Sequence, residues 1–173
     1  MYLKHKVNVG KGWSSHMWML YETIINSSGT VIEFGCGIGS TPFLHWMCKG
    51  FGRKLITYES EEQFYLYAKQ FQSKMHRIVK VNDWMTDVNI KDRAGVILID
   101  HAVPQKDYTW GYRGRDVVRF KDSAEFLVLH DTEEPDTYGY TEEMYSNFKY
   151  RFDWKECRPW ATVLSNFKDL KNL

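Results

Sequence analysis

Short apolar runs alternate with amphipathic stretches along most of the chain, and this order is typical of α/β proteins. Runs rich in valine, isoleucine and leucine predict strands that are buried on both faces, as in a parallel sheet covered by helices. The predicted strands are residues 31–34, 54–58, 77–81, 95–99 and 125–130. Between them, apolar residues at helical spacing predict helices over residues 40–48, from residue 60 onward and over residues 113–121.

The two ends of the chain add further elements. Residues 1–13 are polar and basic, and they predict a loose arm. A leading helix then begins at Ser14 or Ser15, with apolar residues at i, i+3, i+4, i+7 and i+8 on its expected buried face. That face consists of Met17, Leu20, Tyr21, Ile24 and Ile25. Residues 149–155 and 161–165 alternate in polarity and predict an antiparallel pair, which completes a doubly wound sheet of seven strands, six parallel and one reversed.

The stretch from residue 30 to residue 41 carries the clearest chemical signal. A strand is followed there by three alternate glycines and by two hydroxyl residues that open a helix. These residues are Gly35, Gly37, Gly39, Ser40 and Thr41. Glycine lets the backbone approach a ligand closely, because it has no Cβ. A dinucleotide fingerprint would place its third glycine at position 40, and no Gly-Lys-Ser/Thr sequence of a phosphate-binding P-loop follows.

The acid ahead of these glycines, Glu33, completes a Glu-x-Gly-x-Gly-x-Gly sequence. This sequence resembles motif I of the class I S-adenosylmethionine (SAM) methyltransferases, in which the loop passes under the methionine half of the cofactor. The resemblance implies a Rossmann-like fold and SAM as the cofactor, with the glycines, Ser40 and Thr41 as binding residues. It also implies that the acid at the Glu33 position helps to hold the methionine half, often through water. The alternative is a glycine-rich turn in some other doubly wound protein.

Two later strand ends fit the same cofactor. Glu59, with Ser60 beside it, ends the second strand about 20 residues after the last glycine, where nucleotide-binding sheets place an acid that accepts hydrogen bonds from ribose hydroxyls. Ser60 and Gln63 also predict a capping box, so a solvated acid in the first turn of the next helix is the alternative interpretation of Glu59. In the family that the glycine motif resembles, an acid after the third strand binds the adenine amino group. Asp83 stands at this place and Trp84 would stack on the ring; a turn followed by a core tryptophan is the alternative.

Polar residues also end the fourth and fifth strands, as Asp100-His101 and His130-Asp131-Thr132. Ligands bind at the carboxyl ends of the strands in open α/β sheets, so we expect two acids and two histidines to face one cleft. These endings resemble the small-molecule O-methyltransferases of the class I family, which implies that Asp100 also contacts the cofactor. His101 or His130 is the expected base, because imidazole titrates near neutrality, and Asp131 is the third catalytic candidate. The alternative is that these strand-end residues are structural and only form hydrogen bonds with backbone amides of the loops.

A bound metal ion is a second way to activate an acceptor hydroxyl. In some relatives, acids at these strand ends hold a divalent cation, which makes Asp100 and Asp131 candidate ligands for Mg²⁺. Thr132 stands where catechol-type relatives have an asparagine, so two carboxylates remain, and these alone are too few for a hard cation. We therefore expect base catalysis without a metal.

Composition narrows the class of protein. The 173 residues suffice for one domain, with the arm and leading helix in residues 1–29 and the cofactor-binding domain in residues 30–173. The net charge of +1 gives no electrostatic support for DNA as the acceptor. The chain also lacks the Pro-Pro and Pro-Cys sequences that DNA methylases carry. No apolar run approaches the roughly 20 residues of a membrane span, and the first residues lack the apolar core of a signal peptide. Three widely spaced cysteines indicate a reducing, cytoplasmic location. His16 is expected at the surface, and an approach to the ligand is the alternative.

We therefore predict a SAM-dependent methyltransferase that methylates an oxygen of a small molecule or sugar. Its acceptor pocket is expected from the arm, from the loops at 102–111 and 132–141, or from the second subunit of a homodimer. A catalytically inert SAM-binding protein, acting as a sensor or subunit, is the alternative function. An enzyme that uses NAD or a nucleotide sugar is a third hypothesis, which the glycine spacing disfavours.

Overall fold

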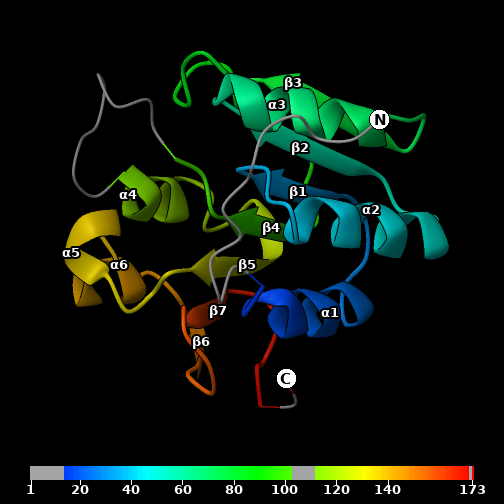
Figure 1. Ribbon diagram of the computed structural model, residues 1–173. Coiled ribbons are helices and arrows are strands. Elements are labelled where there is room, and N and C mark those ends of the chain that lie inside the picture. Colours follow the sequence, from blue (N-terminus) through cyan, green and yellow to red (C-terminus); the bar gives the residue numbers. More distant parts are fainter. Residues whose placement is uncertain (1–13, 103–111, 172) are drawn as a thin grey trace.

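A single sheet is the frame of the computed structural model, which describes residues 14–102, 112–171 and 173 (Figure 1). Its seven strands lie in the order β3-β2-β1-β4-β5-β7-β6. They are β1 (Val31–Phe34), β2 (Leu55–Glu59), β3 (His76–Lys80), β4 (Ala94–Ile99), β5 (Ala124–His130), β6 (Tyr150–Trp154) and β7 (Ala161–Ser165). Strands β1 to β5 pair in parallel, whereas β7 is antiparallel to both β5 and β6. The predicted α/β Rossmann-like fold, with one reversed strand, is confirmed.

Helices cover both faces of this sheet. They are α1 (Met17–Ile25), α2 (Ser40–Gly50), α3 (Glu62–Ala68), the 3₁₀ helix η1 (Lys69–Phe71), α4 (Tyr112–Arg119), α5 (Pro135–Tyr138) and α6 (Glu142–Tyr145). Figure 1 shows α1 and α2 on one side of the sheet and α4, α5 and α6 on the other. Because both faces are covered, every residue of β4 is buried, and the strand therefore reads as a continuous apolar run.

The alternation of side chains along each strand divides the core into two halves. In β4, Val96 and Leu98 belong to the half that contains buried residues of α1 and α2. Ile97 and Ile99 belong to the other half, which contains buried residues of α4 and α6. Each buried aliphatic side chain stabilises the fold by about 1.5–3 kcal/mol, so a one-residue slip of the strand would be costly. The same alternation decides where the side chains just after each strand point.

Helix α1 differs from its prediction. Its buried residues are Met19, Leu20, Thr23 and Ile24. Tyr21 and Ile25, which were expected on that face, are 38% and 43% exposed. The prediction is therefore right for Leu20 and Ile24 and wrong for Tyr21 and Ile25. The helix carries apolar residues on more than one side, and Thr23 is tolerated inside because its hydroxyl donates to the Met19 carbonyl at 2.7 Å.

The start of α3 also differs from its prediction. The residue before the helix is Glu61, and no side chain caps the first turn. Ser60 Oγ instead donates to the carbonyl of Ala102, at 3.1 Å. The expected capping box of Ser60 and Gln63 is therefore wrong. In α6, by contrast, Thr141 caps the helix, and its Oγ1 accepts a hydrogen bond from the backbone N–H of Met144.

Some expectations concern parts of the chain outside the described ranges. The arm over residues 1–13 lies there, as does all of the 102–111 loop except its first residue. The division into residues 1–29 and 30–173 stays a prediction. Among the helices that the structure describes, none combines the length and the hydropathy that a membrane crossing requires.

Candidate functional site

The glycine loop after β1 is shaped by two close approaches. Gly35 has a φ of +88°, and a Cβ at this position would lie 2.5 Å from the backbone oxygen of Asp100. A Cβ at Gly37 would lie 2.6 Å from Oγ of Ser40. A side chain at either position would therefore displace its neighbour, and Gly35 adopts a backbone conformation that other residues avoid. The loop is held against the end of β4 on one side and against the start of α2 on the other.

Glu33 anchors this loop from inside the core. Its side chain is fully buried. Its carboxylate accepts hydrogen bonds from the hydroxyls of Ser40 at 2.6 Å, Thr57 at 2.7 Å and Thr41 at 3.0 Å. Burial raises the pKa of Glu33 to about 7, although the three hydroxyls oppose the rise. Glu33 therefore ties the first turn of α2 to β2.

A line of polar contacts continues from Glu33 to the outer part of α2. Thr57 Oγ1 lies 2.8 Å from Nε2 of His76, at the start of β3. Nδ1 of His76 lies 3.1 Å from Nδ1 of His45, which is half-buried on α2. Burial lowers the pKa of His76 to about 4, with the charge of His45 as the second cause, so His76 is neutral near pH 7.

Glu59 holds the same loop from β2. It is 3% exposed, and its two carboxylate oxygens accept hydrogen bonds from the backbone N–H groups of Cys36 and Glu61, each at 2.6 Å. Burial raises the pKa of Glu59, while these backbone hydrogen bonds lower it. The carboxylate therefore links the glycine loop to the turn before α3.

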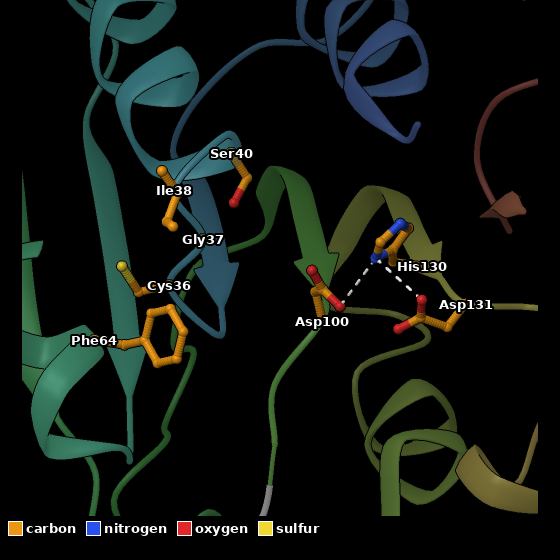
Figure 2. A pocket seen from close by; sticks show the side chains of 8 residues that line it. All are labelled: Cys36, Gly37, Ile38, Ser40, Phe64, Asp100, His130 and Asp131. Atoms are coloured by element: carbon orange, nitrogen blue, oxygen red, sulfur yellow. Dashed lines mark hydrogen bonds and ion pairs between the residues drawn. The ribbon is translucent and has the colours of Figure 1, made fainter. Parts of the chain in front are cut away.

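The glycine loop and the ends of β4 and β5 line one pocket (Figure 2). Its volume is about 170 Å³, and it is lined by Cys36, Gly37, Ile38, Ser40, Phe64, Asp100, His130 and Asp131. Figure 2 shows Asp100, His130 and Asp131 grouped at one side of the pocket and the loop residues at the other. Side chains alternate between the two faces of a sheet. Asp100 and His130 meet because each follows by two residues a side chain that faces α1 and α2, Leu98 in β4 and Val128 in β5. Nδ1 of His130 lies 3.2 Å from Oδ1 of Asp100.

Arg113, which sequence reasoning missed, ties this polar group together. It is 5% exposed, and its guanidinium contacts Oδ1 of Asp100 at 3.1 Å and Oδ2 of Asp131 at 2.9 Å. It also donates to the backbone oxygens of Asp100, His101 and His130. Burial alone would raise the pKa of Asp100, but Arg113 and His130 hold it well below its usual range. The Asp100 carboxylate is thus kept ionised.

Asp131 reaches Arg113 only through an unusual backbone conformation. By strand alternation its side chain would point away from that of His130, but its φ is +58°. This left-handed conformation costs a non-glycine residue about 1–3 kcal/mol, which the ion pair with Arg113 helps to offset. Burial opposes a charge on His130, yet Asp100 and Asp131 more than compensate, so the pKa of His130 is raised above its ordinary value.

His101 does not share the pocket, and the expectation that both histidines face one cleft is wrong. Its side chain is fully buried, on the opposite face of the sheet from His130. Nε2 of His101 lies 3.0 Å from Oδ2 of Asp116 on α4, and burial lowers the pKa of His101. Strand alternation explains this placement, because His101 has the parity of Ile99 and not that of Leu98.

The two residues predicted at the adenine lie apart from the pocket lining. Trp84 is 5% exposed and belongs to the core, where its ring lies 4.2 Å from that of His101 and 5.7 Å from that of Phe34. Asp83 is exposed, and its Oδ1 accepts a hydrogen bond from the backbone N–H of Met85 at 2.8 Å. The core-tryptophan interpretation thus describes Trp84, and a cofactor contact by Asp83 stays a prediction.

His16 joins the pocket cluster, and its expected place at the surface is wrong. It is 1% exposed, and its ring centroid lies 4.2 Å from that of His130. Burial lowers the pKa of His16 to about 3, and the charge of His130 adds to the effect. Beside it, Ser15 Oγ lies 3.1 Å from Nε2 of His130. The signal in the sequence was spacing: His16 precedes the buried residues Met19 and Leu20 by three and four positions.

Comparison with known proteins identifies the fold. No family model and no curated protein sequence matches this chain. The N-terminal domain of human METTL16 in complex with SAH is similar in structure, with 13% identity, a TM-score of 0.63, and coverage of 97% of this chain and 75% of that one. The human METTL16 catalytic domain in complex with the MAT2A 3′UTR hairpin 1 matches with 13% identity and a TM-score of 0.62, over 90% of this chain and 70% of that one.

A bacterial structure is similar to the same extent. It is a candidate O-methyltransferase from Klebsiella pneumoniae, with 11% identity and a TM-score of 0.61, over 96% of this chain and 84% of that one. At these identities the similarity establishes the fold. That fold is the seven-stranded class I methyltransferase fold, as the glycine motif predicts.

Proposed function

We propose that this protein binds SAM and transfers its methyl group to an oxygen atom of a small molecule or sugar. One observation carries the proposal: the glycine loop and the cluster of Asp100, His130 and Asp131 line the same pocket. The glycine loop and a set of groups that can accept or donate protons thus lie on opposite sides of this pocket (Figure 2). The fold supports the cofactor, because a neighbour of the same fold holds SAH, the demethylated product of SAM.

The loop residues fit a cofactor of this kind. The pocket wall at Gly37 is bare backbone, beside Ser40, so a ligand can approach the main chain there. Glu59 is our proposed ribose ligand, since its oxygens accept backbone hydrogen bonds from Cys36 and Glu61 and each carboxylate oxygen can accept two. Glu33 is fully enclosed by hydroxyls, so in this proposal it holds the loop in shape and does not touch the ligand. SAM, when bound, supplies a methyl group that is already electrophilic.

His130 is the proposed base. With Nδ1 held by Asp100, Nε2 faces Ser15 and is the nitrogen available to take the proton of an acceptor hydroxyl. Arg113 keeps Asp100 ionised and in place, and Asp131 fixes Arg113. Asp100 and Asp131 do not fit a Mg²⁺ site, because two carboxylates supply too few oxygens for a hard cation.

An RNA acceptor is a second candidate, because one fold neighbour is a complex with an RNA hairpin. The net charge of +1 gives it no electrostatic support, since RNA binding draws most of its affinity from phosphate contacts with basic residues. A SAM-binding protein without catalysis is the other alternative. Both are outcomes of the test below.

Calorimetry with SAM, SAH and NAD tests the cofactor first, and we expect SAM and SAH to bind and NAD to bind much more weakly. A screen of SAM consumption against metabolite pools and folded RNA then tests the acceptor. We expect turnover with a hydroxyl-bearing small molecule. His130→Asn should lower turnover about 10²–10⁴-fold with unchanged SAM affinity, and His101→Asn, outside the pocket, should have a far smaller effect. Equal or tighter NAD binding would refute the proposal.

A further inference from the structure

His16 has no partner for either of its ring nitrogens within the part of the chain that the structure describes. Its side chain is 1% exposed, so bulk water does not serve as the partner. A buried polar group without a hydrogen bond is destabilising and rare in folded proteins. Within the described residues, both ring nitrogens of His16 are thus available to a ligand at this place.

Three side chains that could ligate a metal ion meet at His16. One nitrogen of His16, one nitrogen of His130 and one carboxylate oxygen of Asp100 lie within 4.8 Å of one another. The separation of His130 Nδ1 from Asp100 Oδ1 is 3.2 Å. Two ligands bound at about 2.0–2.1 Å to one tetrahedral ion would lie roughly 3.3 Å apart, so this edge already has the required length.

The donor atoms select the class of ion. Two imidazoles and one carboxylate suit zinc and its neighbours in the first transition row, whereas Mg²⁺ and Ca²⁺ require a shell of oxygens. Asp100 and Asp131 face the single charge of Arg113, which leaves one negative charge to favour a cation. Arg113 also fixes the orientation of the Asp100 carboxylate, and residues that contact metal ligands commonly orient them in this way.

We propose that His16, Asp100 and His130 form a three-ligand site for a zinc-class divalent ion. An ion bound at Nδ1 of His130 would leave the imidazole proton on Nε2, the proposed base nitrogen, so its binding would switch the base off. This regulatory part rests on the proposed function, whereas the binding of the ion does not. Methyl transfer by the ion-free protein would then survive a chelator.

Calorimetric titration of the chelator-treated full chain with Zn²⁺ tests the site directly. A Cys157→Ser background removes the exposed thiol, which is an alternative zinc ligand. We expect one ion per chain. His16→Ala should weaken binding at least about tenfold, because loss of a direct ligand exceeds the 10–100-fold effects of residues behind the ligands. His16→Cys, which supplies a new ligand, should bind more tightly than His16→Ala.

Two matched measurements separate this site from general effects. His45→Ala, which removes a histidine outside the pocket, should bind Zn²⁺ as the parent does, and circular dichroism should show all variants folded. Absence of Zn²⁺ binding by the parent, or equal binding by His16→Ala, would overturn the site. Zn²⁺ should inhibit methyl transfer in the parent and not in His16→Ala; activation would overturn the inhibitory role. SAM binding, measured separately, reports on the proposed function alone.

Discussion

Glu33 should make the stability of this protein fall as pH rises through neutrality. Its carboxyl is fully buried, and its pKa rises from 4.5 to about 7 on folding, chiefly because burial disfavours the charge. A raised folded pKa contributes stability that is complete below the unfolded pKa and is lost as pH rises through the folded one. The difference corresponds to about 3 kcal/mol, of which about 2.5 kcal/mol is lost between pH 5 and pH 8.

The groups that face Glu33 do not reverse this direction. Burial also raises the pKa of Glu59, so Glu59 likewise makes stability fall as pH rises. His76, which reaches Glu33 through Thr57, has a pKa of about 4 and stays neutral across the interval. The three hydroxyls have no charge to lose.

Glu33→Gln is the matched perturbation. The amide keeps the size of the side chain, its oxygen can accept from Ser40 and Thr41, and its nitrogen can donate to Thr57. Urea unfolding of both proteins at four values between pH 5 and pH 8 isolates the effect, since all other titrating groups are shared. Relative to the parent, the variant should gain about 2.5 kcal/mol over this interval, or about 5–10 °C in melting temperature.

An exposed acid provides the control. Glu142 is 86% exposed and pairs with Arg151 at the surface, so Glu142→Gln should change the pH dependence little. If the free energies of unfolding of the parent and of Glu33→Gln changed equally from pH 5 to pH 8, the reasoning would be refuted.

Three further predictions follow from the loop and its neighbours. Gly37→Val should abolish SAM binding in calorimetry, because the new side chain occupies the pocket wall and meets Ser40; retained affinity would show that the cofactor does not touch this turn. Glu59→Ala should weaken SAM binding at least about tenfold while circular dichroism stays native, since each charge-assisted bond contributes about 1.5–3 kcal/mol; unchanged affinity would reduce Glu59 to a loop anchor. Arg113→Met should lower the free energy of unfolding by about 3–5 kcal/mol, because it leaves two carboxylates without their partner, and Arg113→Lys should recover only part. An equally stable methionine variant would contradict the pairing.

The strands were predictable because helices cover both faces of the sheet. β4 is buried throughout, so its sequence contains no polar interruption until Asp100. The glycine spacing was equally legible, since Gly35 and Gly37 are positions where a Cβ meets another atom at 2.6 Å or less. These features are local, and local sequence carries them.

The site was predictable only in part, because tertiary placement decides it. Asp100 and His101 are adjacent in sequence yet face opposite halves of the core, and the alternation of β4 already contains this information. Helical spacing places His16 in the core once the buried face of α1 is known. Arg113 offers no such signal, because a charged residue on a helix is expected to be exposed. Only the tertiary structure brings two acids, from the ends of β4 and β5, beside it. The left-handed backbone of Asp131 is likewise absent from the alternation.

The polar line from Glu33 through Thr57 and His76 to His45 has a kinetic consequence. Each contact along it is between 2.7 and 3.1 Å long. A hydroxyl can accept one proton while it releases another, and an imidazole can do the same across its two nitrogens, so the line can relay protons. It ends at His45, which is half-buried on the outer side of α2. The carboxyl that anchors the glycine loop can therefore exchange its proton with solvent without any displacement of the loop.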